Sequence, residues 1–150
     1  MTAHPTLSSG ISYRDPRAAI AFLEKAFGFE TTMLIEDDSG KVVHSQLSFG
    51  PCYVMVGGEW SDDHKSPASI GGKNTQTVHI QIETDVDAHC AAARAAGAEI
   101  IMAPETQFYG DRTYRARDPE GHIWTVAQTV KTVTREEAAA DSGLKITGWT

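Results

Sequence analysis

The chain repeats one pattern of helix and strand signals about 70 positions apart. Asp15 precedes an Ala-rich amphipathic run that ends near Gly28, and Asp85 precedes a second run that ends near Gly97. The offsets, 85 − 15 = 70 and 97 − 28 = 69, agree within one residue. Strand-like hydrophobic segments follow each run. A duplicated unit of this kind brings two half-sites together, and ligands commonly bind in the cleft between such halves.

Hydrophobic periodicity predicts the same order of elements in both halves. In each half a strand precedes a helix, and three further strands follow it. The predicted elements of the first half are a strand at 7–13, a helix from 16 to about 27, and strands at 30–36, 41–49 and 52–56. Those of the second half are a strand at 76–84, a helix at 86–96, and strands at 99–103, 112–117 and 122–127. We therefore predict an α+β fold of two βαβββ modules, whose sheets form a paired, incompletely closed barrel with the helices outside.

At 150 residues the chain is expected to be a single domain, 1–150, that buries about two-thirds of its unfolded surface. We place module one at about 7–57, a linker at about 58–75, module two at about 76–128 and a C-terminal tail at 129–150. The linker is rich in Gly, Ser and Lys and is able to cover a cleft. Thr134 and Glu137 have capping-box spacing, which predicts a short helix to about 141.

Composition excludes several classes of protein. The formal charge of −7 argues against a nucleic-acid partner and against attraction to anionic membranes. No secretory leader and no run of about 18 apolar residues is visible, so we expect a cytoplasmic protein without a membrane partner. Cys52 and Cys90 have no metal or redox spacing, and we expect both to be buried thiols.

Several motifs together resemble a known superfamily. They are Tyr-Arg-Asp-Pro at 13–16, the run at 22–29, Asp-Val-Asp-Ala-His at 85–89, Tyr-Gly-Asp-Arg at 109–112, and Arg-Asp-Pro-Glu-Gly-His-Ile-Trp at 117–124. Over about 10–127 the sequence resembles the vicinal oxygen chelate superfamily, which includes glyoxalase I, bleomycin-resistance proteins and extradiol dioxygenases. The resemblance implies the paired-module fold and a homodimer with small-molecule sites in sheet-lined clefts.

The resemblance also implies where a metal would bind. The superfamily's enzymes hold a divalent ion with one ligand from the first and last strands of each module. Carried over, these positions fall on Ser8 or Ser9, Met55, His79 and Thr125. One imidazole with hydroxyl and thioether companions is a poor ligand set for such an ion. We therefore expect no metal ligands and no cofactor, although a divalent metal held in an unconventional way stays open.

The candidate ligand-binding residues come from strand alternation and from the linker. Ile80 and Ile82 alternate with His79 and Gln81, so the polar pair is expected to face the cleft. His79 is also a weak candidate for an acid–base catalyst, because its ordinary pKa suits proton transfer near neutrality. The full candidate set comprises His79, Gln81, Tyr53, Met55, Trp60, Arg115 and Thr125.

Other notable residues have simpler interpretations. We expect His122 to make a structural hydrogen bond and Trp124 to pack in the core, while His4, His64 and His89 are expected to be solvated. The arginines at 112, 115 and 117 either bind an anion near the cleft or pair locally with acidic neighbours.

Three functions remain open. The first is a metal-free protein that binds an organic molecule in the cleft, like the drug-sequestering proteins the chain resembles. The second is a lyase, isomerase or dioxygenase-type enzyme of the same superfamily, using His79 as acid–base or holding an unconventional metal. The third is a regulatory or assembly domain whose cleft is filled by side chains.

Overall fold

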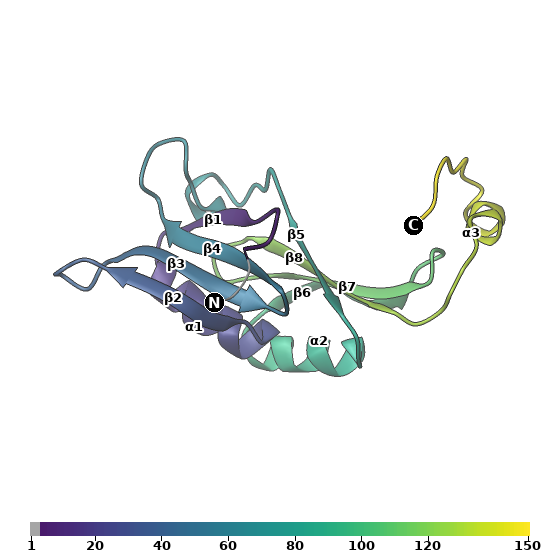
Figure 1. Cartoon of the computed structure of the whole chain (residues 1–150), viewed down its shortest axis with the longest axis horizontal. Helices are drawn as coiled ribbons and strands as arrows, with labels where there is room; N and C mark the ends of the chain where they lie inside the picture. The colour runs from purple at the N-terminus through teal and green to yellow at the C-terminus, as the bar shows by residue number, and fades with distance from the viewer. Residues whose placement is uncertain (1–3) are drawn as a thin grey trace.

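The computed structural model describes residues 4–150. Its eight strands form two four-stranded sheets, ordered β1-β4-β3-β2 and β5-β8-β7-β6 (Figure 1). The elements are β1 (Ser9–Tyr13), α1 (Pro16–Phe27), β2 (Glu30–Glu36), β3 (Val42–Phe49), β4 (Cys52–Gly58), a short 3-10 helix (Pro67–Ser69), β5 (Val78–Ile82), α2 (Val86–Ala95), β6 (Glu99–Thr106), β7 (Asp111–Arg117), β8 (Ile123–Thr129) and α3 (Arg135–Ser142).

Each sheet has the same mixed topology. Its first strand runs parallel to its last strand, and all its other neighbours are antiparallel. The sheets do not close into a barrel. The predicted α+β fold of two βαβββ units is confirmed, and "module one" and "module two" below mean β1–β4 with α1 and β5–β8 with α2.

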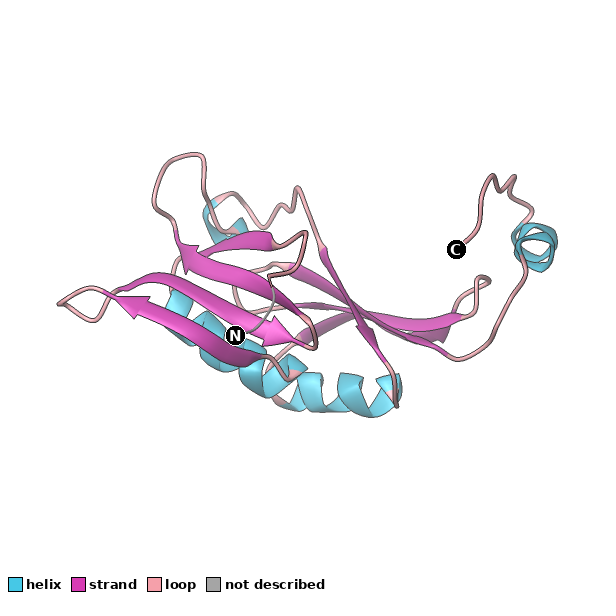
Figure 2. Cartoon of the chain, in the orientation of Figure 1, coloured by secondary structure: helices cyan, strands magenta, loops and turns pink. Residues whose placement is uncertain are grey.

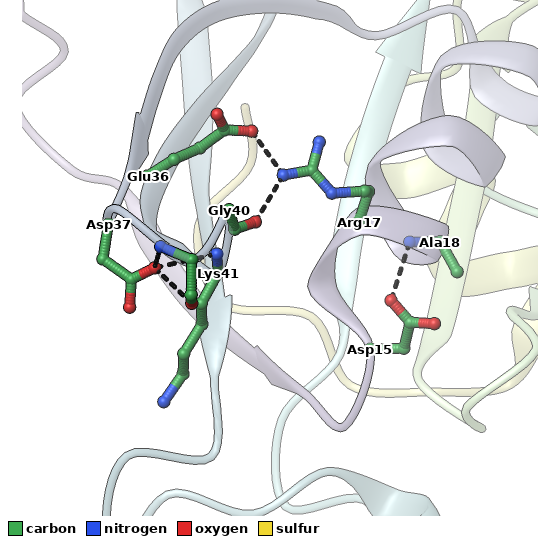
Figure 3. A network of polar contacts seen from close by, with 8 residues as sticks. Asp15, Arg17, Ala18, Glu36, Asp37, Gly40 and Lys41 are labelled. Carbon is green, nitrogen blue, oxygen red and sulfur yellow. Dashed lines mark hydrogen bonds and ion pairs between the residues drawn. The ribbon is translucent and has the colours of Figure 1, made fainter.

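The two main helices begin where their capping residues require. The Asp15 carboxylate accepts the backbone N–H of Ala18 at 3.1 Å (Figure 3). Pro16 occupies the first helical position, where no N–H is needed. Gly28 ends α1 at φ = 85°, a conformation that favours glycine. Asp85 caps α2 in the same way, accepting from the backbone of Ala88 at 3.0 Å.

Both helices cover the same side of the two sheets (Figure 2). Side chains on that side form one buried cluster that includes both modules. Its large members with 2% exposure or less are Tyr13, Leu23, Phe27, Leu47, Val56, Val86, Tyr114, Trp124 and Val126. The opposite sides of the sheets carry partly or fully exposed side chains, so any ligand surface on the sheets lies there.

A polar network fixes the β2–β3 hairpin against α1. The Arg17 guanidinium donates to the Glu36 carboxylate and to the carbonyl of Gly40, the latter at 2.8 Å (Figure 3). Within the turn, Asp37 accepts the backbone N–H of Lys41 at 3.0 Å. Because the ion pair is exposed, we expect it to orient the hairpin while contributing no more than about 1 kcal/mol.

The turn between β7 and β8 joins the two modules. The Asp118 carboxylate, 5% exposed, accepts the hydroxyl of Tyr13 at 2.5 Å and the indole N–H of Trp124 at 3.1 Å. Its other oxygen accepts the backbone N–H groups of Glu120 (3.1 Å) and His122 (3.0 Å). Tyr13 comes from module one and the rest from module two. The buried charge is therefore well hydrogen-bonded across the junction, which offsets the cost of removing it from water.

Glu120 strengthens the same junction from the outer side of the turn. Its carboxylate accepts the backbone N–H groups of Arg14 (2.6 Å) and Asp15 (2.9 Å), directly before α1, and the hydroxyl of Ser66 in the linker (2.7 Å). The imidazole of His122 reaches the carbonyl of Ser12 at 2.8 Å, which confirms its predicted structural role. Trp124 is fully buried, as the alternation of β8 predicts.

His89 lies where α1 and α2 meet, and the prediction that it is solvated is wrong. Because the carbonyl of Phe27 can only accept, Nε2 of the neutral ring donates to it (3.1 Å). Nδ1 then accepts the hydroxyl of the fully buried Tyr114 at 2.6 Å. Burial lowers the pKa of His89, although the bond to Phe27 acts in the opposite direction. The site thus favours the neutral ring.

Three further differences from the expected pattern are small. The first strand begins at Ser9 and not at 7, and β6 extends to Thr106. Cys90 is buried as expected, but Cys52 is exposed at the start of β4, so the prediction of a buried thiol there is wrong.

The tail contains the predicted helix, α3, with Thr134 accepting the N–H of Glu137 at 3.1 Å. No helix among residues 4–150 is both long and apolar enough to cross a membrane.

We predict that Asp118→Ala destabilises the protein by about 3 kcal/mol, because two buried side-chain donors lose their acceptor. Denaturant unfolding monitored by circular dichroism measures the change. The matched control, Asp38→Ala, removes an exposed turn carboxylate and should cost no more than about 0.5 kcal/mol. Equal losses in the two variants would contradict a specific role for Asp118.

We also predict that acid destabilises the fold partly through His89. Its folded pKa lies below the ordinary value of 6.5, so the unfolded chain binds a proton first as the pH falls. The stabilising contribution is therefore complete above pH 6.5 and decreases as the pH falls from there toward the folded pKa. Denaturation midpoints between pH 8 and pH 5 should decrease more in the wild type than in His89→Gln. Parallel curves would show that His89 does not contribute.

Candidate functional site

A groove of about 930 Å³ runs along the seam between the two modules. One wall comes from module one and includes Phe29, Phe49 and Tyr53, while β5 supplies the other wall. The rings of Phe29 and Phe49 are 5.3 Å apart in an edge-to-face arrangement at 61°. The groove is therefore an aromatic and aliphatic cavity with polar groups along β5.

Three of the predicted ligand-binding residues, Tyr53, His79 and Gln81, line this groove. Ile80, between the two polar residues of β5, is 5% exposed and packs in the core. His79 and Gln81 are exposed on the uncovered side of the sheet. The alternation predicted for this strand is thus confirmed.

Strand pairing places two more candidates beside His79. Thr125 of β8 lies opposite His79, and Arg115 of β7 lies opposite Thr125. Residues paired in this way project to the same side of a sheet. His79, Thr125 and Arg115 therefore form one row across the uncovered side of module two.

A hydrogen-bond chain leads from His79 along the sheet to a carboxylate. His79 Nε2 and Gln81 Oε1 are 3.1 Å apart, Gln81 Nε2 donates to the hydroxyl of Thr129 at 3.1 Å, and that hydroxyl donates to Asp111 at 2.7 Å. The chain thus connects β5, β8 and β7.

The chain determines which nitrogen of His79 carries the proton. The carboxylate of Asp111 only accepts, so the single hydroxyl proton of Thr129 points to it. Thr129 must then accept from the amide N–H of Gln81, whose oxygen faces His79. His79 therefore donates from Nε2, and Nδ1 keeps its lone pair. The Asp111 carboxylate, acting through Thr129 and Gln81, therefore leaves Nδ1 of His79 as a hydrogen-bond acceptor for a ligand.

The side-chain hydroxyl of Ser8 is a further feature of the groove. Ser8 lines it, and its hydroxyl oxygen is buried without a hydrogen-bond partner among the described residues. A buried hydroxyl without a partner is costly, and protein atoms cover this oxygen, so a ligand in the groove would reach it only if its neighbours moved.

Module one does not reproduce the row that contains His79. Met55 of β4 lies opposite Gly10, and neither Ser8 nor Ser9 occupies the position equivalent to His79. The prediction of a serine there is wrong because the offset at the first strand is 79 − 10 = 69, whereas 125 − 55 = 70 at the last. Gly10 supplies no side-chain donor at all.

The four equivalent positions do not fit the divalent metal of the family's enzymes. They offer one imidazole, one hydroxyl, one thioether and a glycine, whereas such ions prefer several carboxylate or imidazole ligands. Among residues 4–150 no group of three or more His, Cys, Asp or Glu side chains is arranged to hold an ion. The predicted lack of a metal ligand set stays a prediction.

Trp60 and Met55 lie outside the groove lining. Trp60 is 75% exposed in the linker and stacks on His64, with ring centres 3.7 Å apart at 28°. Met55 lies on the uncovered side of module one, opposite Gly10 and Gln46. Neither residue is brought next to His79, and their ligand-binding roles stay predictions.

The three arginines of β7 behave differently from one another. Arg112 forms two hydrogen bonds to Asp87 of α2, at 2.8 and 3.0 Å, and this pairing lowers the pKa of Asp87. Arg117 pairs with Glu99 across the hairpin at 3.5 Å. Arg115 has no ion-pair partner among the described residues. Its guanidinium is therefore free, in the same row as His79 and Thr125.

Residues 3–126 match the sequence profile of the glyoxalase/bleomycin resistance protein/dioxygenase superfamily. The chain belongs to this superfamily. An uncharacterized protein of Mycobacterium bovis is 33% identical over 144 residues, which cover 93% of each chain. A relative from Mycobacterium tuberculosis is also uncharacterized and 33% identical over 93% of this chain and 84% of its own.

Two solved structures of similar fold come from Micromonospora and Streptomyces. TioX from Micromonospora sp. ML1 is 28% identical, with a TM-score of 0.65 over 85% of this chain and 99% of its own. TnmS3, an antibiotic binding protein from Streptomyces sp. CB03234, is 18% identical, with a TM-score of 0.62 over 86% of this chain and 98% of its own. At that identity the likeness to TnmS3 concerns the fold alone.

We predict that neutral His79 carries its proton on Nε2. Nitrogen-15 chemical shifts of the imidazole, measured above pH 8, distinguish the two tautomers. Thr129→Val breaks the chain to Asp111 and should shift the ring toward a mixture of tautomers, because Gln81 is then free to reverse. Thr31→Val in module one is the matched control and should change nothing at His79. A pure Nδ1–H tautomer in the wild type would contradict the chain.

Proposed function

We propose that this protein binds an organic small molecule in the seam groove, without the metal that the family's enzymes use. The groove itself carries the proposal. Its volume of about 930 Å³ is that of a site for a drug-sized molecule, and such sites combine apolar walls with a few polar groups. A cleft filled by side chains, as in a vestigial site, does not match this volume.

The walls favour a flat, aromatic or polycyclic body. Phe49 and Tyr53 are the partly exposed rings of this wall, and the buried ring of Phe29 packs edge-to-face against Phe49. Aromatic side chains contribute large contact areas and prefer offset or edge-to-face neighbours. A ring system inserted along the seam satisfies that preference.

The polar groups favour a ligand that carries a hydroxyl group. His79 keeps a lone pair at Nδ1, which is able to accept a hydrogen bond from a donor on the ligand. A phenol or hydroxylated polycycle supplies that donor.

The comparisons support the same proposal at the level of the fold. TnmS3, with a similar fold, is an antibiotic binding protein.

We further propose that residues 1–150 act as one domain and that the protein works as a cytoplasmic homodimer. Exposed apolar side chains on β2 support pairing, since Met33, Leu34 and Ile35 are 40–46% exposed. Two free cysteines agree with a reducing compartment.

Catalysis is the second candidate, and the orientation of His79 favours it. An imidazole whose Nε2 is held by a hydrogen bond and whose Nδ1 is free has the arrangement of a general base. A proton on the ligand's reacting carbon or oxygen would be taken by Nδ1. Isotope exchange from a bound ligand into water, lost in His79→Ala, would distinguish this activity from binding alone.

We predict that hydroxylated aromatic compounds bind about fivefold more tightly than their methyl ethers, since a single hydrogen bond contributes about 1 kcal/mol. Isothermal titration calorimetry of matched pairs, with and without EDTA, measures the preference. His79→Ala should remove it, whereas Tyr53→Ala should weaken both members of a pair.

The control for this titration is His44→Ala, which removes a histidine of β3 that does not line the groove. It should leave both affinities unchanged. Loss of binding on adding EDTA would contradict the metal-free proposal. Equal affinity of phenols and ethers in the wild type would contradict the role given to Nδ1.

A further inference from the structure

A second cavity, of about 740 Å³, lies between the tip of the β6–β7 hairpin and the segment that follows β8. We propose that this tail cavity binds an organic cation. Gln81 lines both this cavity and the seam groove. Most of the other lining residues follow residue 126, where the match to the superfamily ends. The tail cavity is therefore built largely by a part of the chain outside the family's common fold.

Main-chain hydrogen bonds hold the hairpin tip in place. The carbonyl of Gly110 accepts the N–H groups of Val130 (3.0 Å) and Lys131 (3.1 Å). Gly110 has φ = 100°, and a Cβ there would lie 2.1 Å from the carbonyl oxygen of Lys131, so no other residue fits without movement. This close approach fixes the neighbouring Phe108 and Tyr109 at the mouth of the cavity.

The tail completes the cavity from the other side. The chain leaves the body after β8, passes through α3 and returns toward the hairpin (Figure 1). The indole N–H of Trp149 donates to the carbonyl of Val133 at 3.0 Å, which holds the returning segment. Trp149 lines the cavity and is 42% exposed. A large aromatic ring is thus held in place but left open to solvent.

The aromatic walls suit a positive charge. Phe108 and Tyr109 stand perpendicular, with ring centres 5.2 Å apart at 90°, so a face and an edge are presented together. Tyr109 is 40% exposed. The faces of tryptophan, tyrosine and phenylalanine attract cations, and groups of such rings recognise quaternary ammonium ligands.

The charged groups around the tail cavity also favour a positively charged ligand. Asp111 contributes a carboxylate, of which Oδ1 accepts the hydroxyl of Thr129. The hydrogen-bond chain from His79 ends on this carboxylate, and each of its donors points toward Asp111. Lys131 also lines the cavity, but it is exposed and its long side chain can extend into water. The net charge of −7 attracts cations from solution.

Titration with three matched probes tests the proposal: phenyltrimethylammonium, its neutral isostere tert-butylbenzene, and benzoate. The indole N–H signals of the protein report the site, and Trp149→Leu identifies the signal of Trp149. We expect the ammonium probe to shift that signal and to bind about tenfold more tightly than the isostere, with benzoate weakest. Trp149→Leu should abolish binding as seen by ligand-detected saturation transfer.

Two charge variants separate a local carboxylate from the overall charge. Asp111→Asn should weaken the ammonium probe about tenfold, while Asp38→Asn, which changes the net charge equally at a distant turn, should have no effect. An unshifted Trp149 signal in the free Asp111→Asn variant confirms that its tail is still folded. If that signal moves, Tyr109→Leu, which leaves the hydrogen-bond chain intact, should also weaken the probe about tenfold.

The proposal is overturned if the isostere or benzoate binds as tightly as the ammonium probe, or if the two charge variants behave alike. Tyr53→Ala distinguishes this site from the seam groove, because it should weaken groove ligands and leave the ammonium probe unaffected. A probe that responds to Tyr53→Ala occupies the groove, which would also overturn a separate cation site. Failure of groove binding alone would leave the cation result unchanged.

Discussion

The buried carboxylate of Asp118 is the constraint on which the rest of the structure depends. It connects Tyr13 at the end of β1 to Trp124 in β8, and thereby one module to the other. Burial and the nearby carboxylate together raise the pKa of the Tyr13 hydroxyl well above its ordinary value, so the hydroxyl remains a donor throughout the neutral range. β1 and β5 are edge strands of their sheets, and both supply residues to the groove.

A second carboxylate, Asp111, organises the uncovered side of module two. Its effect on His79 passes through Gln81 and Thr129, each of which has only one way to satisfy its neighbour. The same carboxylate lines the tail cavity. The proposed groove site and the proposed cation site therefore share one hydrogen-bond chain.

Much of the fold was predictable because its signals are local. Asp15, Pro16 and Gly28 determine the ends of α1 through capping and backbone geometry alone, and alternation places Trp124 in the core. The position of His79 on the uncovered side followed from the same alternation.

The remaining features depend on contacts between distant segments. His89 is half-buried because α2 meets the end of α1, which no periodicity in α2 reveals. The partnership of Thr129 with Asp111 depends on the register of β7 against β8, where the two residues are paired. The position equivalent to His79 was predicted at Ser8 or Ser9, whereas Gly10 occupies it, although the helix ends already indicated an offset of 69. A difference of one position reverses the side of a strand on which a residue lies.

The two modules have the same topology but offer different chemistry to a ligand. A divalent ion requires donor atoms from both modules at once, and module one presents Gly10 and Met55 where module two presents His79 and Thr125. An organic molecule has no such requirement. Its apolar part needs a wall of matching shape, and its polar groups need a few hydrogen-bonding partners that fix its orientation. The aromatic wall of module one and the hydrogen-bonded chain of module two meet that requirement without any symmetry between them. The asymmetry that makes the residues poor at holding a metal is therefore the property that suits them to orient an organic ligand.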